Sequence, residues 1–262
     1  MKQFHIIPDR MNPEESRELA EKWNAVFEYN DFFLPAVLED AKEVERRIAL
    51  YKKLVRNRSK DTLHGAFFDL CVSSTDPEIA RISVKRMRQS MEIAEKLGVR
   101  AVIFHTNTIA GFSIPGYEER FIEQNEKVMR TLLTEYKGID IYMENMFDLR
   151  PDILSHLAER MQDTNFGVCY DVAHGNLGGS CNMEEWFRTL SPYVRHLHIN
   201  DNDGTADTHQ AVGWGQTNWT EFGRLMKKYS PDSSILIEVS GKEKIEKSFE
   251  YMKENKIYPF EA

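Results

Sequence analysis

Short apolar segments alternate with longer amphipathic segments along almost the whole chain. The short segments carry few charges, a pattern typical of strands buried in a parallel sheet. We predict strands over Gln3–Ile7, Ala25–Tyr29, Thr62–Phe68, Ala101–His105, Ile139–Glu144, Phe166–Asp171, Val194–Ile199 and Ile235–Val239.

The amphipathic segments between these strands predict helices. One begins with an N-cap residue, Asp76, and a proline at the first helical position, Pro77, and it continues at helical spacing to a C-terminal cap, Gly98. The other predicted helices cover Pro13–Trp23, Glu39–Arg56, Tyr117–Tyr136, Pro151–Met161, Met183–Leu190, Asn218–Tyr229 and Lys242–Asn255. Successive βα units predict one domain over residues 1–262, a single (β/α)8 TIM barrel of the α/β class, with a doubly wound open sheet as the alternative.

Composition agrees with a globular barrel. The chain has 262 residues, 41% of them hydrophobic and 29% charged, and barrels of this kind commonly run to about 250 residues. No apolar run is long enough for a membrane span, and the first residues do not read as a signal peptide. The three cysteines form no CxxC pair, so we expect a reduced compartment, a cytoplasmic location and no membrane partner.

The balance of charge bears on partners. A formal net charge of -8 works against nucleic acid, whose binding depends on neutralisation of phosphates by Lys and Arg. The basic residues that cluster lie on predicted helices, where a solvated outer face is the simpler interpretation. We therefore expect a small-molecule partner, with nucleic acid disfavoured. The oligomeric state, a homo-oligomer included, is left open.

Metal-binding side chains gather at the predicted carboxyl ends of the strands, where barrels of this kind place their chemistry. They are His64, His105, Glu144, Asp171 with His174, His198, and Glu238. A lone histidine or glutamate at a strand end is more often a hydrogen-bonded structural residue. Repetition at corresponding places favours one shared site. His5, His156 and His196 fall outside this set, and we interpret His196, one layer below His198, as a core or supporting residue.

The stretch VRHLHINDNDGTADTHQAVGWG, residues 194–215, is the richest of these strand ends. Its strand stops at Asn200, turn residues follow to Gly204, and Asp207 and His209 then stand two positions apart. In an extended loop both side chains can point the same way. This stretch therefore predicts a metal site at the open end of the barrel.

From HGAFFD to ILIEVSG the chain resembles the xylose isomerase-like TIM barrel superfamily, which includes sugar isomerases and epimerases, inosose and dehydroshikimate dehydratases, and endonuclease IV. In the isomerase branch, the resemblance implies one divalent ion on Glu144, Asp171, His198 and Glu238. Endonuclease IV-like sites imply further zinc ligands, which fall on His64, His105, His174, Asp207 and His209. Both sets are complete, so the ligands alone do not choose between one ion and three.

Other motifs favour the sugar branch. The run DNDGTADTHQAVGWGQTNW resembles the D-N-D-G, D-x-H and G-x-G-x-x-D-W pattern of sugar isomerases, with Asn218 where Asp is usual. Endonuclease IV-like proteins usually have proline where this chain has Ala66. The sequence also shows no basic, aromatic-interleaved loop for duplex DNA.

The resemblance implies a mechanism in which a divalent ion, Mn²⁺, Mg²⁺, Co²⁺ or Zn²⁺, polarises a substrate carbonyl and stabilises an enediolate. Glu144 and Glu238 are then the catalytic pair that takes and returns the proton. His64, His105, His174 and Trp214 are expected to bind substrate, although Trp214 at the barrel mouth has a purely structural alternative.

We therefore predict a metal-dependent isomerase or epimerase of a sugar, sugar phosphate or related polyol. The alternatives are a dehydratase or lyase in the same barrel, an endonuclease IV-like zinc phosphoesterase on abasic DNA, and a metal-binding protein without catalysis. The number of bound ions separates them: one favours sugar chemistry, and three favour phosphoester chemistry.

Overall fold

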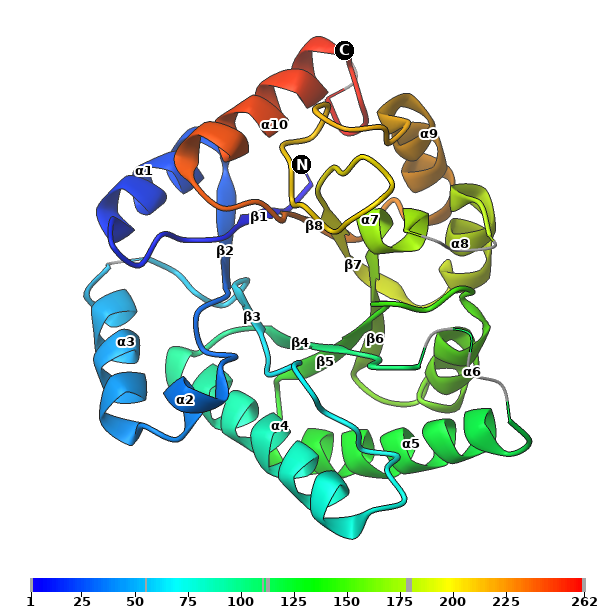
Figure 1. Ribbon diagram of the computed structural model, residues 1–262. Helices are drawn as coiled ribbons and strands as arrows, with labels where there is room; N and C mark the ends of the chain where they lie inside the picture. The colour runs from blue at the N-terminus through cyan, green and yellow to red at the C-terminus, as the bar shows by residue number, and fades with distance from the viewer. Residues whose placement is uncertain (1, 55, 110, 112–113, 178–180, 261–262) are drawn as a thin grey trace.

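The computed structural model describes residues 2–54, 56–109, 111, 114–177 and 181–260. Eight parallel strands close into a barrel in the order β1 to β8, each paired with its neighbours in the sequence and β8 paired with β1. Helices surround this barrel on the outside (Figure 1). The predicted (β/α)8 barrel is confirmed, and the open-sheet alternative is wrong.

The strands are short, and the helices between them are longer. The strands are β1 Phe4–Ile6, β2 Ala25–Tyr29, β3 Thr62–His64, β4 Ala101–His105, β5 Asp140–Glu144, β6 Phe166–Asp171, β7 Val194–Ile199 and β8 Ser234–Ile237. The helices are α1 Pro13–Trp23, α2 Pro35–Leu38, α3 Ala41–Lys53, α4 Pro77–Leu97, α5 Tyr117–Glu135, α6 Asp152–Arg160, α7 Val172–Asn176, α8 Met183–Leu190, α9 Trp219–Tyr229 and α10 Lys242–Glu254. None of the described helices is long and apolar enough to cross a membrane.

Helix boundaries follow from capping. Asp76 accepts a hydrogen bond from the Glu78 backbone N–H at 2.8 Å, and Gly98 ends α4 in the left-handed conformation with φ 74°, as the sequence predicts. Asp40 caps α3 in the same way. That cap explains why the helix predicted from Glu39 begins later. Residue 55, near its predicted end, lies outside the described residues.

Two differences from the predicted elements affect the site. The strand predicted to run to Phe68 leaves the sheet after His64, so the two phenylalanines that resemble strand residues lie in a loop. The last strand, predicted over Ile235–Val239, begins one residue earlier in the structure and ends at Ile237. Glu238 therefore lies just beyond the strand. Helices α2 and α7 were not predicted, because each is too short to show a helical period.

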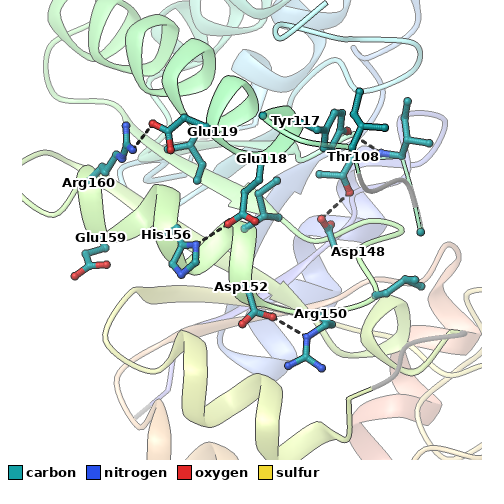
Figure 2. A pocket seen from close by; sticks show the side chains of 17 residues that line it. Thr108, Tyr117, Glu118, Glu119, Asp148, Arg150, Asp152, His156, Glu159 and Arg160 are labelled. Carbon is teal, nitrogen blue, oxygen red and sulfur yellow. Dashed lines mark hydrogen bonds and ion pairs between the residues drawn. The ribbon is translucent and has the colours of Figure 1, made fainter.

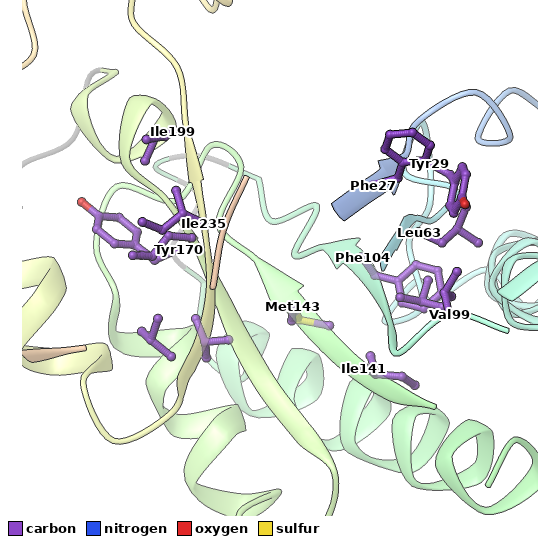
Figure 3. Close-up of a cluster of buried hydrophobic side chains, with 14 of the residues drawn as sticks. Phe27, Tyr29, Leu63, Val99, Phe104, Ile141, Met143, Tyr170, Ile199 and Ile235 are labelled. Carbon is purple, nitrogen blue, oxygen red and sulfur yellow. The ribbon is translucent and has the colours of Figure 1, made fainter. Parts of the chain in front are cut away.

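The two faces of the strands have different surroundings. One face packs under the helices in the main hydrophobic core, which includes Phe27, Leu63, Phe104, Ile141 and Tyr170 (Figure 3). The other face lines the barrel interior, where only a small apolar cluster of Ala101, Ile103, Tyr142 and Cys169 occurs among the described residues. Many of the other interior positions carry buried polar side chains. The barrel interior is therefore where the chemistry-bearing residues lie.

Candidate metal centre

The predicted ligands all lie at one end of the barrel. His64, His105, Glu144 and Asp171 are the last residues of β3, β4, β5 and β6. The others follow close behind: His198 near the end of β7, Glu238 directly after β8, His174 in α7, and Asp207 with His209 in the β7–α9 loop. We call these nine residues the ligand cluster.

Glu144 lies at the middle of the ligand cluster. Its Oε2 is 3.1 Å from His198 Nδ1, 3.4 Å from His105 Nε2 and 3.7 Å from His64 Nε2. Its Oε1 is 3.3 Å from His174 Nδ1. The two oxygens of one carboxylate therefore face different histidines.

Possible ligand atoms fall into three linked groups, in each of which they lie within 4.8 Å of one another. The groups are His64, Glu144, His198 and Glu238; Glu144, Asp171 and His174; and His174, Asp207 and His209. Glu144 and His174 each belong to two groups. The four-ligand set implied by the isomerase resemblance is thus divided, because Asp171 groups with His174 rather than with His198 and Glu238.

Three histidines of the ligand cluster are oriented by the backbone. Nδ1 of His64, His174 and His209 lies 3.1, 2.9 and 2.8 Å from the carbonyl oxygens of Gly65, Asn145 and Glu238. A carbonyl only accepts, so Nδ1 carries the proton and Nε2 keeps its lone pair. This outer hydrogen bond is typical of metal-binding histidines.

The ligand cluster fits divalent ions. Glu144 Oε1 and Oε2, Asp171 Oδ2 and His198 Nδ1 are buried and have no hydrogen-bond partner among the described groups, a state that is costly unless a cation satisfies them. Bonds of about 2.0–2.1 Å in a tetrahedral zinc site put neighbouring ligand atoms about 3.4 Å apart. Asp207 Oδ2 lies 3.3 Å from His174 Nε2 and 3.1 Å from His209 Nε2, close to that spacing.

Electrostatics point the same way. Burial raises the pKa of Asp171 well above its ordinary value, and the negative charges of Glu238 and Glu144 add to this effect although His174 opposes it. For Glu144 burial also favours the neutral form, but the charges of His198 and His105 outweigh it and hold the pKa well below its ordinary value. Without ions, these carboxylates therefore depend on shared protons and charged histidines.

The ligand cluster opens to solvent on one side. The side chains of Asp207 and His209 are 25% and 36% exposed, whereas those of the other seven ligands are at most 5% exposed. On another side, the Phe67 ring packs 4.5 Å from the His105 ring and 5.0 Å from the His64 ring. A small molecule reaching the ligands must therefore pass the β7–α9 loop.

The sequence prediction missed two buried residues that contact the ligand cluster. Glu28 of β2 lies 3.0 Å from His198 Nε2 through its Oε1, and a charged residue among the apolar residues of AVFEY was a signal that could have found it. Asn145 binds both the backbone N–H and the carbonyl of Asp171, at 2.8 and 2.9 Å. It has no comparable signal, because an asparagine after a strand reads as a turn residue.

Trp214 and Asn218 have local roles. The indole of Trp214 is 51% exposed, and no contact described in the structure joins it to the ligand cluster, so its substrate role stays a prediction. Asn218 caps α9 by accepting a hydrogen bond from Glu221 N–H at 3.1 Å. An amide oxygen caps a helix as well as a carboxylate does, which explains how Asn replaces the usual Asp.

A groove of about 1180 Å³ lies apart from the ligand cluster, along α5, α6 and the loops after β4 and β5 (Figure 2). Its charged side chains pair with one another: His156 lies 2.6 Å from Glu118, Arg160 donates to Glu119 at 2.6 Å, and Arg150 donates to Asp152 at 2.9 Å. None of the nine ligands lines it. Within the described part of the chain, no group of possible metal ligands occurs in this groove.

The fold is a (β/α)8 barrel, and its ligand cluster contains groups of side chains that could hold metal ions. A family model described as xylose isomerase-like TIM barrel matches residues 21–255, so the chain belongs to this family. The similar proteins whose names state an activity are enzymes.

Individual similarities are distant. The uncharacterized protein MJ1311 of Methanocaldococcus jannaschii is 26% identical over 201 residues, or 73% of this chain and 68% of that protein. A probable endonuclease 4 of Symbiobacterium thermophilum is 25% identical over 164 residues, or 55% of this chain and 58% of that protein. The chain thus matches less than two thirds of the endonuclease.

Solved structures extend the likeness over the whole fold. The TTHB071 protein of Thermus thermophilus, soaked with ZnCl2, has a TM-score of 0.75 at 23% identity, with 97% of each chain covered. A D-tagatose 3-epimerase-like protein has a TM-score of 0.74 at 23% identity, covering 97% of this chain and 96% of that chain. At these identities the similarity shows the fold alone.

Proposed function

We propose that the protein is a hydrolase of phosphate esters that uses more than one divalent ion in the ligand cluster. The observation that supports this most directly is the sharing of Glu144 between two ligand groups. A carboxylate whose two oxygens face different histidines suits a bridge between two ions. Paired ions act in many phosphatases and nucleases.

Charge supports the same proposal. The carboxylates of the ligand cluster are those of Glu144, Asp171, Asp207 and Glu238. One dication leaves this set negative, two balance it, and a third makes the centre positive. A positive centre at the end of a barrel with an acidic exterior attracts one phosphate group more readily than an extended nucleic-acid backbone.

The chain's own contribution is to hold and orient ligands. Backbone carbonyls fix the histidine tautomers, Asn145 fixes Asp171, and the surrounding barrel excludes water from the deeper groups. Bound ions would supply Lewis acidity at a phosphoryl oxygen and positive charge for the leaving oxygen. Asp207 and His209, the exposed ligands, lie where a substrate enters.

The isomerase or epimerase predicted from the sequence is the second candidate. Glu144 and Glu238 both approach His198 Nδ1, at 3.1 and 3.5 Å, so a single ion there would have a carboxylate from two different strands. Burial raises the pKa of Glu238 less than His198 lowers it, and the result is about 2. That pKa belongs to the metal-free protein, in which His198 is charged; an ion on His198 Nδ1 would take the place of the proton, so the pKa does not argue against Glu238 as a base.

The test combines ion counting with two assays. We expect elemental analysis of the Zn²⁺- or Mn²⁺-loaded protein to give more than one ion per chain. We also expect the loaded protein to hydrolyse at least one compound in a panel of phosphomonoesters, phosphodiesters and abasic duplex, and a chelator to stop this hydrolysis. The same protein is incubated in heavy water with ketoses, their phosphates and keto-inositols. A single ion, with deuterium entering an α-carbon and no ester cleaved, would replace our proposal with the isomerase; subsequent loss of water would indicate a dehydratase.

A further inference from the structure

A second set of polar residues, all buried except the partly buried Ser234, lies directly below the ligand cluster in the barrel interior. We call it the lower layer, and it consists of His5, Glu28, Thr62, His196 and Ser234. Glu28 Oε2 accepts a hydrogen bond from the Thr62 hydroxyl at 2.5 Å and lies 3.1 Å from His196 Nε2. Glu28 Oε1 lies 3.0 Å from His198 Nε2. Glu28 is therefore the point at which the lower layer meets the ligand cluster.

The proton positions around Glu28 follow from what each group can donate. Glu28 Oε1 and His198 Nε2 form a close ion pair, although their geometry is not that of a hydrogen bond. A carboxylate only accepts, so His196 Nε2 carries a proton, and the negative charge of Glu28 also favours a proton on His198 Nε2. His196 Nδ1 then has a lone pair and accepts from the Ser234 hydroxyl, 2.6 Å away. In the neutral form of His198, Nδ1 also has a lone pair, and it faces Glu144 and Glu238 at 3.1 and 3.5 Å. That lone pair is available to an ion.

His198 is thus oriented differently from three other histidines of the ligand cluster. His64, His174 and His209 turn Nδ1 toward backbone carbonyls. In His198 the ring is reversed, and the partner of its outer nitrogen is a side chain. A side chain can be replaced without changing the fold of the backbone, so this orientation is open to a direct experiment.

We infer that Glu28 is a positioning residue that fixes the tautomer and ring orientation of His198 and thereby presents His198 Nδ1 to an ion shared with Glu144 and Glu238. Carboxylate partners of this kind raise the basicity of a histidine ligand and typically contribute about 10- to 100-fold to affinity for the metal. The inference rests on the metal-binding part of the proposed function and not on the reaction.

Glu28→Gln tests this role because the amide keeps the size of the side chain but adds a donor. If the amide N–H faces His198, Nε2 must accept, and the proton moves to Nδ1, where it blocks the ion. We expect one class of ion to bind about 10- to 100-fold more weakly in a competition titration with a chromophoric zinc chelator. The group of His174, Asp207 and His209 should keep its affinity, because it does not contain His198.

Nitrogen-detected NMR of histidine side chains in the zinc-loaded protein, in which an ion takes the place of the second proton on His198, gives a readout that a general loss of structure does not mimic. The wild type should show His198 with its proton on Nε2, and Glu28→Gln should show a shift of that proton toward Nδ1. Glu28→Asp keeps the charge and should restore the wild-type tautomer in part. Circular dichroism verifies that each variant folds.

Asp61→Asn is the matched control. Asp61 is also buried, accepts hydrogen bonds from the Phe27 backbone and the Tyr29 hydroxyl at 3.0 and 2.9 Å, and has no described contact with the ligand cluster. It should leave all ion affinities unchanged. Unchanged ion affinities and an unchanged His198 tautomer in Glu28→Gln would overturn the inference, as would a wild type that binds no ion. A wild type that binds ions but cleaves no ester would refute only the proposed function.

Discussion

The two buried polar sets inside the barrel look alike in composition but differ in how their atoms are satisfied. In the lower layer both nitrogens of His196 and the hydroxyls of Thr62 and Ser234 have partners. In the ligand cluster above it, both oxygens of Glu144 and His198 Nδ1 have no hydrogen-bond partner among the described groups.

Proximity alone does not separate the two sets. Ligand atoms of His5, Glu28 and His196 also lie within 4.8 Å of one another, yet His196 and Thr62 find partners for their donors and acceptors, and Glu28 Oε1 is the atom of this set without a hydrogen bond. A set satisfied to this degree costs less to bury than a set of lone pairs that face one another, which needs a cation. The comparison therefore supports our proposal that the ligand cluster holds the ions and that the lower layer supports it.

The largest effect should come from Glu144→Gln. It removes a charged oxygen from two ligand groups at once, so we expect the loss of more than one ion per chain. Activity should fall by about 10²-fold or more, because loss of a residue that only supports a ligand already costs up to about 100-fold. Elemental analysis and turnover of the hydrolysed ester measure both. Asp207→Asn is the control, because Asp207 belongs to one group only and its loss should remove one ion. Equal ion losses in the two variants would contradict a bridging Glu144.

A smaller effect is expected from Thr62→Val in the lower layer. The change removes the donor to Glu28 and the hydroxyl that lies 3.1 Å from His5 Nδ1. Leaving buried polar groups without partners costs about 1–3 kcal/mol. The free energy of unfolding, measured in urea, should fall by this amount both with and without zinc.

The control for that experiment is Thr131→Val, whose hydroxyl bonds the Lys127 carbonyl on the exposed side of α5 and should contribute little. If Thr62→Val abolished ion binding without changing the free energy of unfolding, the two layers would not be separable in the way we describe.

How much of this arrangement the sequence predicts depends on how local the signal is. His64, His105, Glu144 and Asp171 could be placed together, because each ends a short apolar strand and parallel strands of a barrel end on the same side. Which residues share an ion could not be predicted, since Asp171 groups with His174 through the turn of α7. That turn is too short to leave a periodic pattern.

Glu28 shows a second limit. It lies in β2 at the same depth as His196 of β7, and these strands are not neighbours in the barrel. Contacts across the interior depend on strand stagger, which one sequence does not reveal. The sequence predicted that His196 supports His198. It did not predict that Glu28 lies between the two histidines, because that contact also crosses the barrel interior.

The smallest predicted effect concerns pH and the exposed edge of the ligand cluster. Burial alone lowers the pKa of His209, but hydrogen bonding to Asp207 and the charge of Glu238 raise it to about 10. A histidine whose folded pKa exceeds its unfolded value of about 6.5 stabilises the fold fully below the unfolded pKa and loses this contribution as pH rises toward the folded one. In metal-free protein the free energy of unfolding should therefore fall between about pH 6.5 and 10 more steeply in the wild type than in His209→Asn. Saturation with zinc should remove that difference in slope, because an ion replaces the proton on His209. If the free energy of unfolding falls equally steeply with pH in the metal-free wild type and the variant, the pKa of His209 is not raised in the folded protein. The predicted attraction of His209 to Asp207 and Glu238 would then be wrong.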